Sequence, residues 1–291
     1  MSNSLFATGI NGLVGSEFAT QFANSYTIHS LDIANPLNPV DITDKASVVT
    51  ALSADPTAKF VLHLAAFTNV TDAWNQNGDT SGIAYKVNVT GTRNIVEACQ
   101  ELGLHLIHIS TAYVFDGEKD DLYTEDDAVS PIEWYGQTKA DAEAFVQESA
   151  IDWTILRIDQ PFRSDSFPRL DIAHRIIDGL NTDMLYPQFE NHYFGPTYIN
   201  DFSKVVDWVI RTKTTGLFNA SSGEKWSDFE FATAIANNKG FTTEIQRSNL
   251  DEYLKTLDRP YQRNTAMNTE KLQSVIDFEL TPISKALAEI V

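Results

Sequence analysis

Three glycines spaced three residues apart near the N-terminus constrain this chain more than any other feature. Gly9, Gly12 and Gly15 follow a short apolar run, residues 5–7, and open an amphipathic stretch that begins at Leu13. Glycines in such a turn permit a tight connection, let a phosphate approach the backbone and allow close packing of helix on strand. A helix N-terminus adds free N–H groups that favour phosphate. The pattern predicts a strand–turn–helix unit that binds a dinucleotide, although the spacing alone also occurs in simple tight turns.

A carboxylate stands where such a unit would hold the ribose of an adenosine. Asp32 closes the second apolar run, 17 residues beyond Gly15. A carboxylate there accepts hydrogen bonds from the ribose diol and repels a 2′-phosphate. No arginine follows it in residues 33–35. The sequence therefore favours NAD(H) as cofactor, with NADP(H) as the alternative, and a merely solvated strand end is the competing interpretation of Asp32.

A phenol and an ammonium lie one helical turn apart in an expected helix, residues 133–149. Tyr135 and Lys139 share a face of that helix. A nearby ammonium lowers the pKa of a phenol, so the pair can exchange a proton with a carbonyl oxygen while a hydride moves. Ser110 and Thr111 end an apolar run and would place hydroxyls at the C-terminal edge of the sheet, where ligands bind. Those hydroxyls favour a catalytic site over an ordinary amphipathic helix.

The first 160 residues alternate short apolar runs with amphipathic stretches, which is typical of a parallel sheet covered by helices. We expect an α/β, Rossmann-type doubly wound parallel sheet with a smaller C-terminal substrate-binding lobe. Residues 1–160 would form the NAD(P)-binding domain, 196–220 would return to it, and 161–195 with 221–291 would form the lobe. The expected strands are 5–7, 26–31, 59–64, 104–109 and 153–157, and the expected helices start at 13 and span 81–102, 133–149, 201–211 and 227–239.

Composition excludes several partners and chemistries. The formal charge of −19 disfavours nucleic acid, which requires a basic face. No apolar run is long enough to span a membrane. Cys99 is the only cysteine, which fits a reducing, cytoplasmic location. No spacing of histidines with acids or cysteines indicates a metal, so His63, His105 and His108 are interpreted as packed residues.

Several motifs together resemble the extended short-chain dehydrogenase/reductases. Within them the chain is most similar to the dTDP-4-dehydrorhamnose reductase group of nucleotide-sugar reductases, and the resemblance covers nearly the whole chain. The motifs are the glycine loop, residues 64–68, 87–88 and 109–117, the Tyr135/Lys139 pair, and the Arg-Pro segment 259–260.

The resemblance implies a role for each matching residue. Thr111 would hydrogen-bond the substrate carbonyl, Tyr135 would donate the proton, and Lys139 would hold the ribose and lower the pKa of the tyrosine. Asn88 would lie near the active site. The implied cofactor-binding residues are Gly9, Gly12, Leu13, Val14, Asp32, Ile33, Asp41, Ile42, Ala65, Ala66, Thr68, Asn88, Tyr135 and Lys139, and the implied substrate-binding residues are Thr111, Ala112, Tyr113, Gln160 and Arg259.

Two departures from the family pattern leave the sugar open. The family usually has an aspartate at Ala112 and an aromatic residue at Gln160. We expect NAD(P)H-dependent reduction of the 4-keto group of a nucleotide-activated deoxysugar. The alternatives are an epimerase that retains its NAD and a non-catalytic NAD(P)-binding regulatory subunit, such as the beta subunit of methionine adenosyltransferase. A nucleotide sugar is the expected ligand, and a homodimer is compatible with the resemblance.

Overall fold

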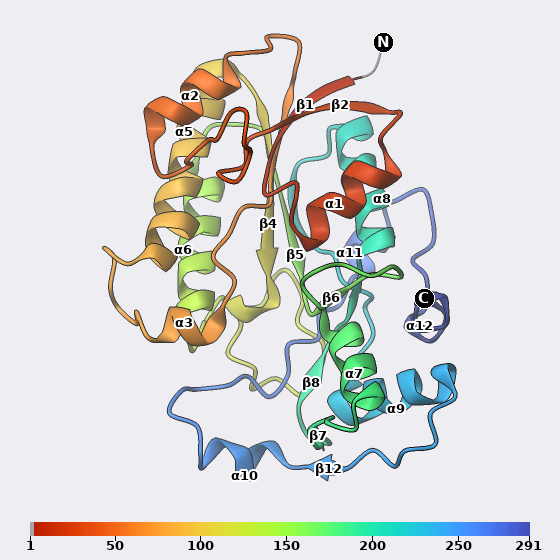
Figure 1. The fold of residues 1–291 in the computed structure, drawn as a ribbon. Coiled ribbons are helices and arrows are strands. Elements are labelled where there is room, and N and C mark those ends of the chain that lie inside the picture. Colours follow the sequence, from red (N-terminus) through yellow and green to blue (C-terminus); the bar gives the residue numbers. More distant parts are fainter. Residues whose placement is uncertain (1–2) are drawn as a thin grey trace.

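The computed structural model describes residues 3–291, and a central sheet of six parallel strands organises it. The strand order is β10-β5-β4-β3-β1-β2 (Figure 1). The chain therefore runs outward in opposite directions on the two sides of the β1/β3 pair. In doubly wound sheets, ligands bind at the carboxyl ends of the strands beside such a reversal.

The sheet strands and the helices around them have the following bounds. In the sheet are β1 (Asn3–Thr8), β2 (Tyr26–Ser30), β3 (Phe60–His63), β4 (His105–Thr111), β5 (Trp153–Ile158) and β10 (Gly216–Asn219); between them lie α1 (Leu13–Gln21), α2 (Lys45–Leu52), α3 (Val70–Trp74), α4 (Ile83–Tyr85), the π-helical turn η1 (Lys86–Gly91), α5 (Thr92–Leu102), the 3₁₀ turn η2 (Ala112–Val114), α6 (Trp134–Glu148) and α8 (Ile199–Thr212). The remaining elements are β6 (Pro161–Phe162), α7 (Ile172–Asn181), β7 (Gln188–Phe189), β8 (Tyr193–Phe194), β9 (Thr197–Tyr198), β11 (Trp226–Ser227), α9 (Asp228–Lys239), β12 (Arg247–Ser248), α10 (Leu250–Leu254), α11 (Glu270–Gln273) and α12 (Ile283–Glu289).

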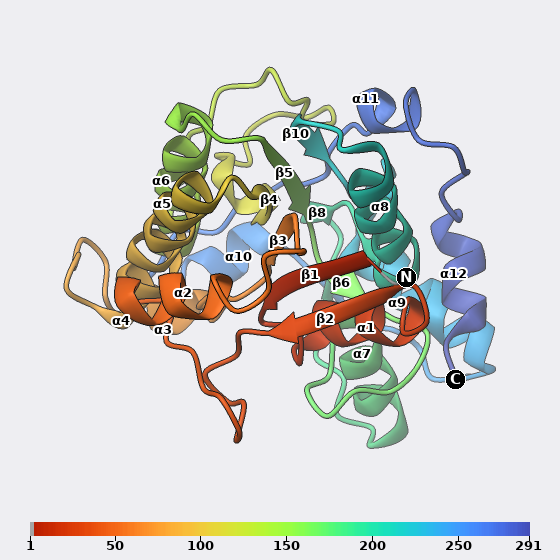
Figure 2. The same ribbon diagram turned by 90° about the horizontal axis from the view of Figure 1, so that it is seen from above.

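Helices cover both faces of the sheet, so its strands are apolar on both sides. Helices α2, α5 and α6 lie on one face, and α1 and α8 lie on the other (Figure 2). Successive side chains of a strand point to opposite faces. Leu5 accordingly packs with Phe18 of α1 and Val209 of α8, whereas Phe6 packs with Ile95 of α5 on the far side.

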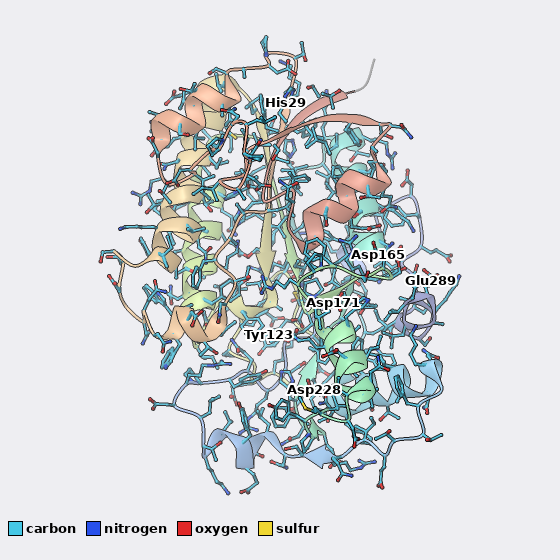
Figure 3. The ribbon with its side chains drawn as sticks, in the orientation of Figure 1. His29, Tyr123, Asp165, Asp171, Asp228 and Glu289 are labelled. Carbon is cyan, nitrogen blue, oxygen red and sulfur yellow. The ribbon has the colours of Figure 1, made fainter. Side chains whose placement is uncertain are left out.

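The lobe lies below the carboxyl ends of the strands and has its own apolar core. Helices α7, α9 and α12 pack there around Phe162, Phe194 and Phe231. Figure 3 shows Asp171 at the N-terminus of α7, where the lobe meets the sheet domain. None of the helices within residues 3–291 is long and apolar enough to cross a membrane.

Two segments join the sheet domain from beyond residue 195. Helix α8 packs on α1, and β10 pairs with β5 at the sheet edge. Helix α11 also lies against β10, and its Leu272 belongs to the core of the sheet domain. The C-terminal segment assigned to the lobe from the sequence is therefore divided between the two cores.

Candidate active site

A cleft of about 770 Å³ opens at the carboxyl ends of the strands, between the sheet domain and the lobe. It is lined by the glycine loop, the ends of β2 to β5 and the start of α7. Of the residues singled out from the sequence, it brings together Gly9, Gly12, Leu13, Val14, Asp32, Ile33, Asp41, Ile42, Ala65, Ala66, Thr68, Thr111, Tyr113, Tyr135, Lys139 and Gln160.

The glycine loop passes close to the backbone of the segment after β3, and the N-terminus of α1 faces the cleft. Gly9 has φ +67°, and a Cβ atom there would lie 2.7 Å from the Ala65 backbone nitrogen, so only glycine fits. Gly12 is the N-cap of α1 and has no side chain with which to satisfy the first N–H groups of the helix. Those N–H groups are a suitable site for phosphate.

The carboxylate of Asp32 holds the glycine loop in this position. Its Oδ1 accepts a hydrogen bond from the Gly9 backbone N–H at 2.5 Å. Its Oδ2 accepts from the backbone N–H of Asn11 at 3.0 Å and from Asn11 Nδ2 at 2.6 Å. Asp32 is therefore more than the solvated strand end of the competing interpretation. It ties the end of β2 to the loop that follows β1 and also lines the cleft.

Tyr135 is placed by the N-terminal cap of α6. Glu133 accepts hydrogen bonds from the backbone N–H groups of Tyr135 at 2.7 Å and Gly136 at 2.6 Å. Burial raises the pKa of Glu133 to about 7, while those two hydrogen bonds and Arg259 lower it. A Cβ atom at Gly136 would lie 2.1 Å from the Tyr113 backbone oxygen, so glycine brings the two segments together.

Lys139 is almost fully buried. Its Nζ donates to the Ile109 backbone oxygen at 2.7 Å and lies 3.2 Å from His108 Nε2. Burial lowers the pKa of Lys139 to about 8. Burial also raises the pKa of Tyr135, against a smaller lowering by a hydrogen bond with Thr111. The expectation that the pKa of Tyr135 lies toward working pH is thus wrong for the free protein, because desolvation of the phenol outweighs the lowering by Thr111 and Arg169.

Buried polar side chains hold helix α6, which carries Tyr135 and Lys139. Asn88 in the π-helical turn η1 donates to Thr138 Oγ1 of α6 at 2.9 Å and to the Phe67 backbone oxygen at 3.0 Å. Its Oδ1 accepts from the Phe67 backbone N–H at 2.7 Å. Asn88 does not line the cleft, so it acts by holding α6 against the segment after β3. π-Helical turns are frequent at functional sites.

The two other sequence-derived residues that do not line the cleft are Ala112 and Arg259. Ala112 is fully buried in an apolar cluster with Phe115 and Met267, so its side chain cannot contact a substrate. Arg259 has its guanidinium over the Tyr261 ring, 4.9 Å from the centroid, and it is Tyr261 that lines the cleft. The geometry therefore does not favour the expected contacts of Ala112 and Arg259 with substrate, which stay predictions.

Sequence reasoning missed three residues that line the cleft: Asp159, Arg175 and Tyr261. Asp159 had a usable signal, because it directly follows β5 and carboxyl ends of parallel strands share one edge. Tyr261 directly follows the Arg-Pro segment, and the position of Arg175 depends on the path of the lobe. Arg169 also lines the cleft and reaches across it, where its Nη1 donates to Thr68 Oγ1 at 3.2 Å.

The chain matches one family model over almost its full length, and its relatives include reductases and a methionine adenosyltransferase subunit. The model described as "RmlD substrate binding domain" matches residues 3–291. The dTDP-4-dehydrorhamnose reductase of Aggregatibacter actinomycetemcomitans is 27% identical over 98% of this chain and 97% of that protein. Methionine adenosyltransferase 2 subunit beta of Mus musculus is 26% identical over 99% and 87%.

Solved structures share the fold. The dTDP-4-dehydrorhamnose reductase from Bacillus anthracis, in complex with NADP, superposes with a TM-score of 0.89 at 23% identity and covers 100% of this chain and 99% of that one. The UDP-glucose 4-epimerase of Thermus thermophilus, in complex with NAD, gives 0.82 at 19% identity and covers 99% and 97%. The expected Rossmann-type fold is confirmed by these likenesses.

Proposed function

The chain belongs to the RmlD substrate binding domain family, and from this premise we propose that it reduces the 4-keto group of a nucleotide-activated deoxysugar with NAD(P)H. One observation carries the proposal. Thr111, Tyr135 and Lys139 converge on the same cleft as the glycine loop. A proton donor and a dinucleotide site in one cleft are what carbonyl reduction requires.

The residues of the cleft fit a nicotinamide dinucleotide. The open N-terminus of α1 offers N–H groups to a pyrophosphate, with Gly12, Leu13 and Val14 beside it. Ala65, Ala66 and Thr68 line the stretch between that helix and Tyr135. When bound there, the reduced nicotinamide supplies the hydride.

Tyr135 and Thr111 are the residues that bind and protonate the carbonyl oxygen in this proposal. Thr111 forms a hydrogen bond with Tyr135 that lowers the pKa of the phenol. With both hydroxyls directed at one carbonyl oxygen, Thr111 polarises it and Tyr135 gives it a proton. Lys139 keeps its ammonium within the same wall of the cleft, where a positive charge favours the phenolate that remains.

We propose NAD(H) as the preferred cofactor, on the strength of Asp32. Its carboxylate lines the cleft beside Ile33, where an adenosine ribose would lie, and its negative charge opposes a 2′-phosphate. For the sugar nucleotide, Arg169 and Arg175 supply positive charge on the lobe side of the cleft. Guanidinium groups are suited to a diphosphate.

Reduction is tested by mixing the purified protein with NADH and dTDP-4-keto-6-deoxyhexose and following the loss of reduced nicotinamide. We expect consumption of NADH that depends on the sugar, matched by formation of the dTDP-6-deoxyhexose. Conversion of a nucleotide sugar with no net loss of NADH supports the epimerase instead. Unchanged NADH and sugar, with tight cofactor binding, supports the regulatory subunit.

A further inference from the structure

Asp159 places a buried carboxyl oxygen in the cleft with no role in the chemistry so far. The residue is 1% exposed and follows the last residue of β5. Its Oδ2 accepts from the Gly195 backbone N–H at 2.9 Å and from Thr265 Oγ1 at 2.7 Å. Within residues 3–291, Oδ1 has no partner of good hydrogen-bond geometry. Burial raises the pKa of Asp159 to about 7, against smaller lowering by Thr265, Gly195 and the nearby Gln160 amide. Buried polar atoms are nearly always paired.

The backbone beside Asp159 is strained. Gln160 has φ +36°, a region that residues other than glycine rarely adopt. Strain of this kind is maintained where the surrounding structure requires it, commonly at ligand sites. Gln160 and Asp159 both line the cleft, so the strained turn lies at its wall.

The position of Asp159 is close to the reacting groups. In the sheet, Thr111 is paired with Ile158, the residue before Asp159. Burial is the main cause of the raised pKa of Tyr113 and of Tyr135, and the nearby charge of Asp159 adds to both shifts. A ligand atom that meets Oδ1 therefore lies near the carbonyl that Tyr135 addresses.

Charge selects the kind of ligand group. A carboxylate repels phosphate, and Arg169 and Arg175 are available in the same cleft for a diphosphate. What a buried carboxyl oxygen binds well is a hydroxyl donor. In a 4-keto-6-deoxy sugar, one neighbour of the carbonyl carbon carries a methyl group and no hydroxyl. The other neighbour, carbon 3, carries a hydroxyl.

We propose that Asp159 binds the carbon-3 hydroxyl of the sugar and makes the site selective for substrates that have it, an inference that rests on the proposed function. Gly195 and Thr265 both hydrogen-bond to Oδ2, so Oδ1 is the oxygen that remains for a ligand hydroxyl. Asp159 thus takes part in recognition, while Tyr135 carries the proton transfer.

Binding of two product-type ligands tests this without turnover. Calorimetry would compare dTDP-6-deoxyhexose with its 3-deoxy analogue, both with NAD⁺ present. We expect the native protein to bind the 3-hydroxy ligand about 10- to 100-fold more tightly, as for one hydrogen bond to a charged group. Asp159→Ala should remove the preference. Asp159→Asn should keep part of it, because the amide oxygen can accept from Gly195 and Thr265 while Nδ2 meets the hydroxyl.

Thr265→Val is the matched control. It removes a hydrogen bond to Oδ2 and leaves Oδ1, so it should lower the melting temperature and retain the preference for the 3-hydroxy ligand. Equal binding of both ligands by the native protein, binding of neither, or a preference that is unchanged in Asp159→Ala overturns the proposal. If the preference is present and depends on Asp159 but NADH is never consumed, the inference holds and the proposed reduction fails.

Discussion

The ammonium of Lys139 lies 3.2 Å from Nε2 of His108, and both side chains are almost fully buried. Burial and the charge of Lys139 lower the pKa of His108, so the imidazole is neutral. With the ammonium donating to Nε2, the imidazole proton lies on Nδ1. The buried ammonium thus contacts one neutral ring and the Ile109 carbonyl, and the charge of Glu143 favours its protonated form.

Such a cation costs stability, and Lys139→Met should recover some of it. The pKa of Lys139 is lowered from 10.5 to about 8, so the unfolded chain holds the proton more strongly than the folded one. Stability of the native protein should therefore rise with pH between about 8 and 10.5. At pH 7 the variant should be more stable by about 1–3 kcal/mol. Urea unfolding at several pH values measures this; a variant less stable at pH 7, or a constant difference across the window, would contradict it.

The buried ion pair between Glu143 and Arg157 fixes helix α6 to strand β5 of the sheet. Arg157 Nε and Nη2 donate to the two carboxylate oxygens at 2.9 and 2.6 Å, and both side chains are at most 2% exposed. Glu143→Ala should destabilise the protein by about 3–5 kcal/mol, because it leaves a buried charge unpaired. Urea unfolding gives the value. The double variant Glu143→Leu/Arg157→Met should recover most of the loss, and a single-variant loss below about 1 kcal/mol is the opposing result.

Asp32 should set the choice between NADH and NADPH. Asp32→Ser removes the charge that opposes a 2′-phosphate and the acceptors for the ribose. The ratio of kcat/KM for NADH to that for NADPH should fall about 10- to 100-fold. Asn11→Ala is the control, since it removes a donor to Asp32 and keeps the charge. If Asp32→Ser lowers both values equally, the residue serves only to hold the glycine loop.

Tyr135 should be needed for turnover and not for cofactor binding. Tyr135→Phe removes the proton donor, so kcat should fall about 10²- to 10⁴-fold while the affinity for NADH stays close to native. The Tyr113 ring lies 5.8 Å from the Tyr135 ring, so Tyr113→Phe is a matched loss of one hydroxyl. Steady-state rates and fluorescence titration of NADH separate the two effects. A Tyr135→Phe variant as active as Tyr113→Phe contradicts the role of Tyr135.

Features that depend on local pattern were predictable from the sequence. The glycine loop, the acidic end of β2 and the helix expected over residues 227–239 lie where the pattern placed them, and α9 begins with a capping box formed by Ser227 and Glu230. The expected helix over residues 81–102 is interrupted by η1, because Asn88 directs its side chain into hydrogen bonds with the loop after β3 and with α6.

Features that depend on tertiary burial were not predictable. Helix α2 carries a β-branched pair, Val48 and Val49, and its one clear signal is the N-cap Asp44. The raised pKa of Tyr135 follows from how deeply the phenol is enclosed, which the Tyr-x-x-x-Lys spacing does not encode. Asp159 stands out because Oδ1 stays unpaired while Gly195 and Thr265, from distant segments, both hydrogen-bond to Oδ2, and the sequence does not show this.

Transfer of an isotope from cofactor to sugar tests the central claim most directly. The protein would be mixed with dTDP-4-keto-6-deoxyhexose and NADH that carries deuterium at the transferred position of the nicotinamide, and the sugar analysed by mass spectrometry and NMR. The account predicts one deuterium at carbon 4 for each NADH consumed, and none with Tyr135→Phe over the same time. A sugar without deuterium, or one converted while the NADH remains, would contradict it.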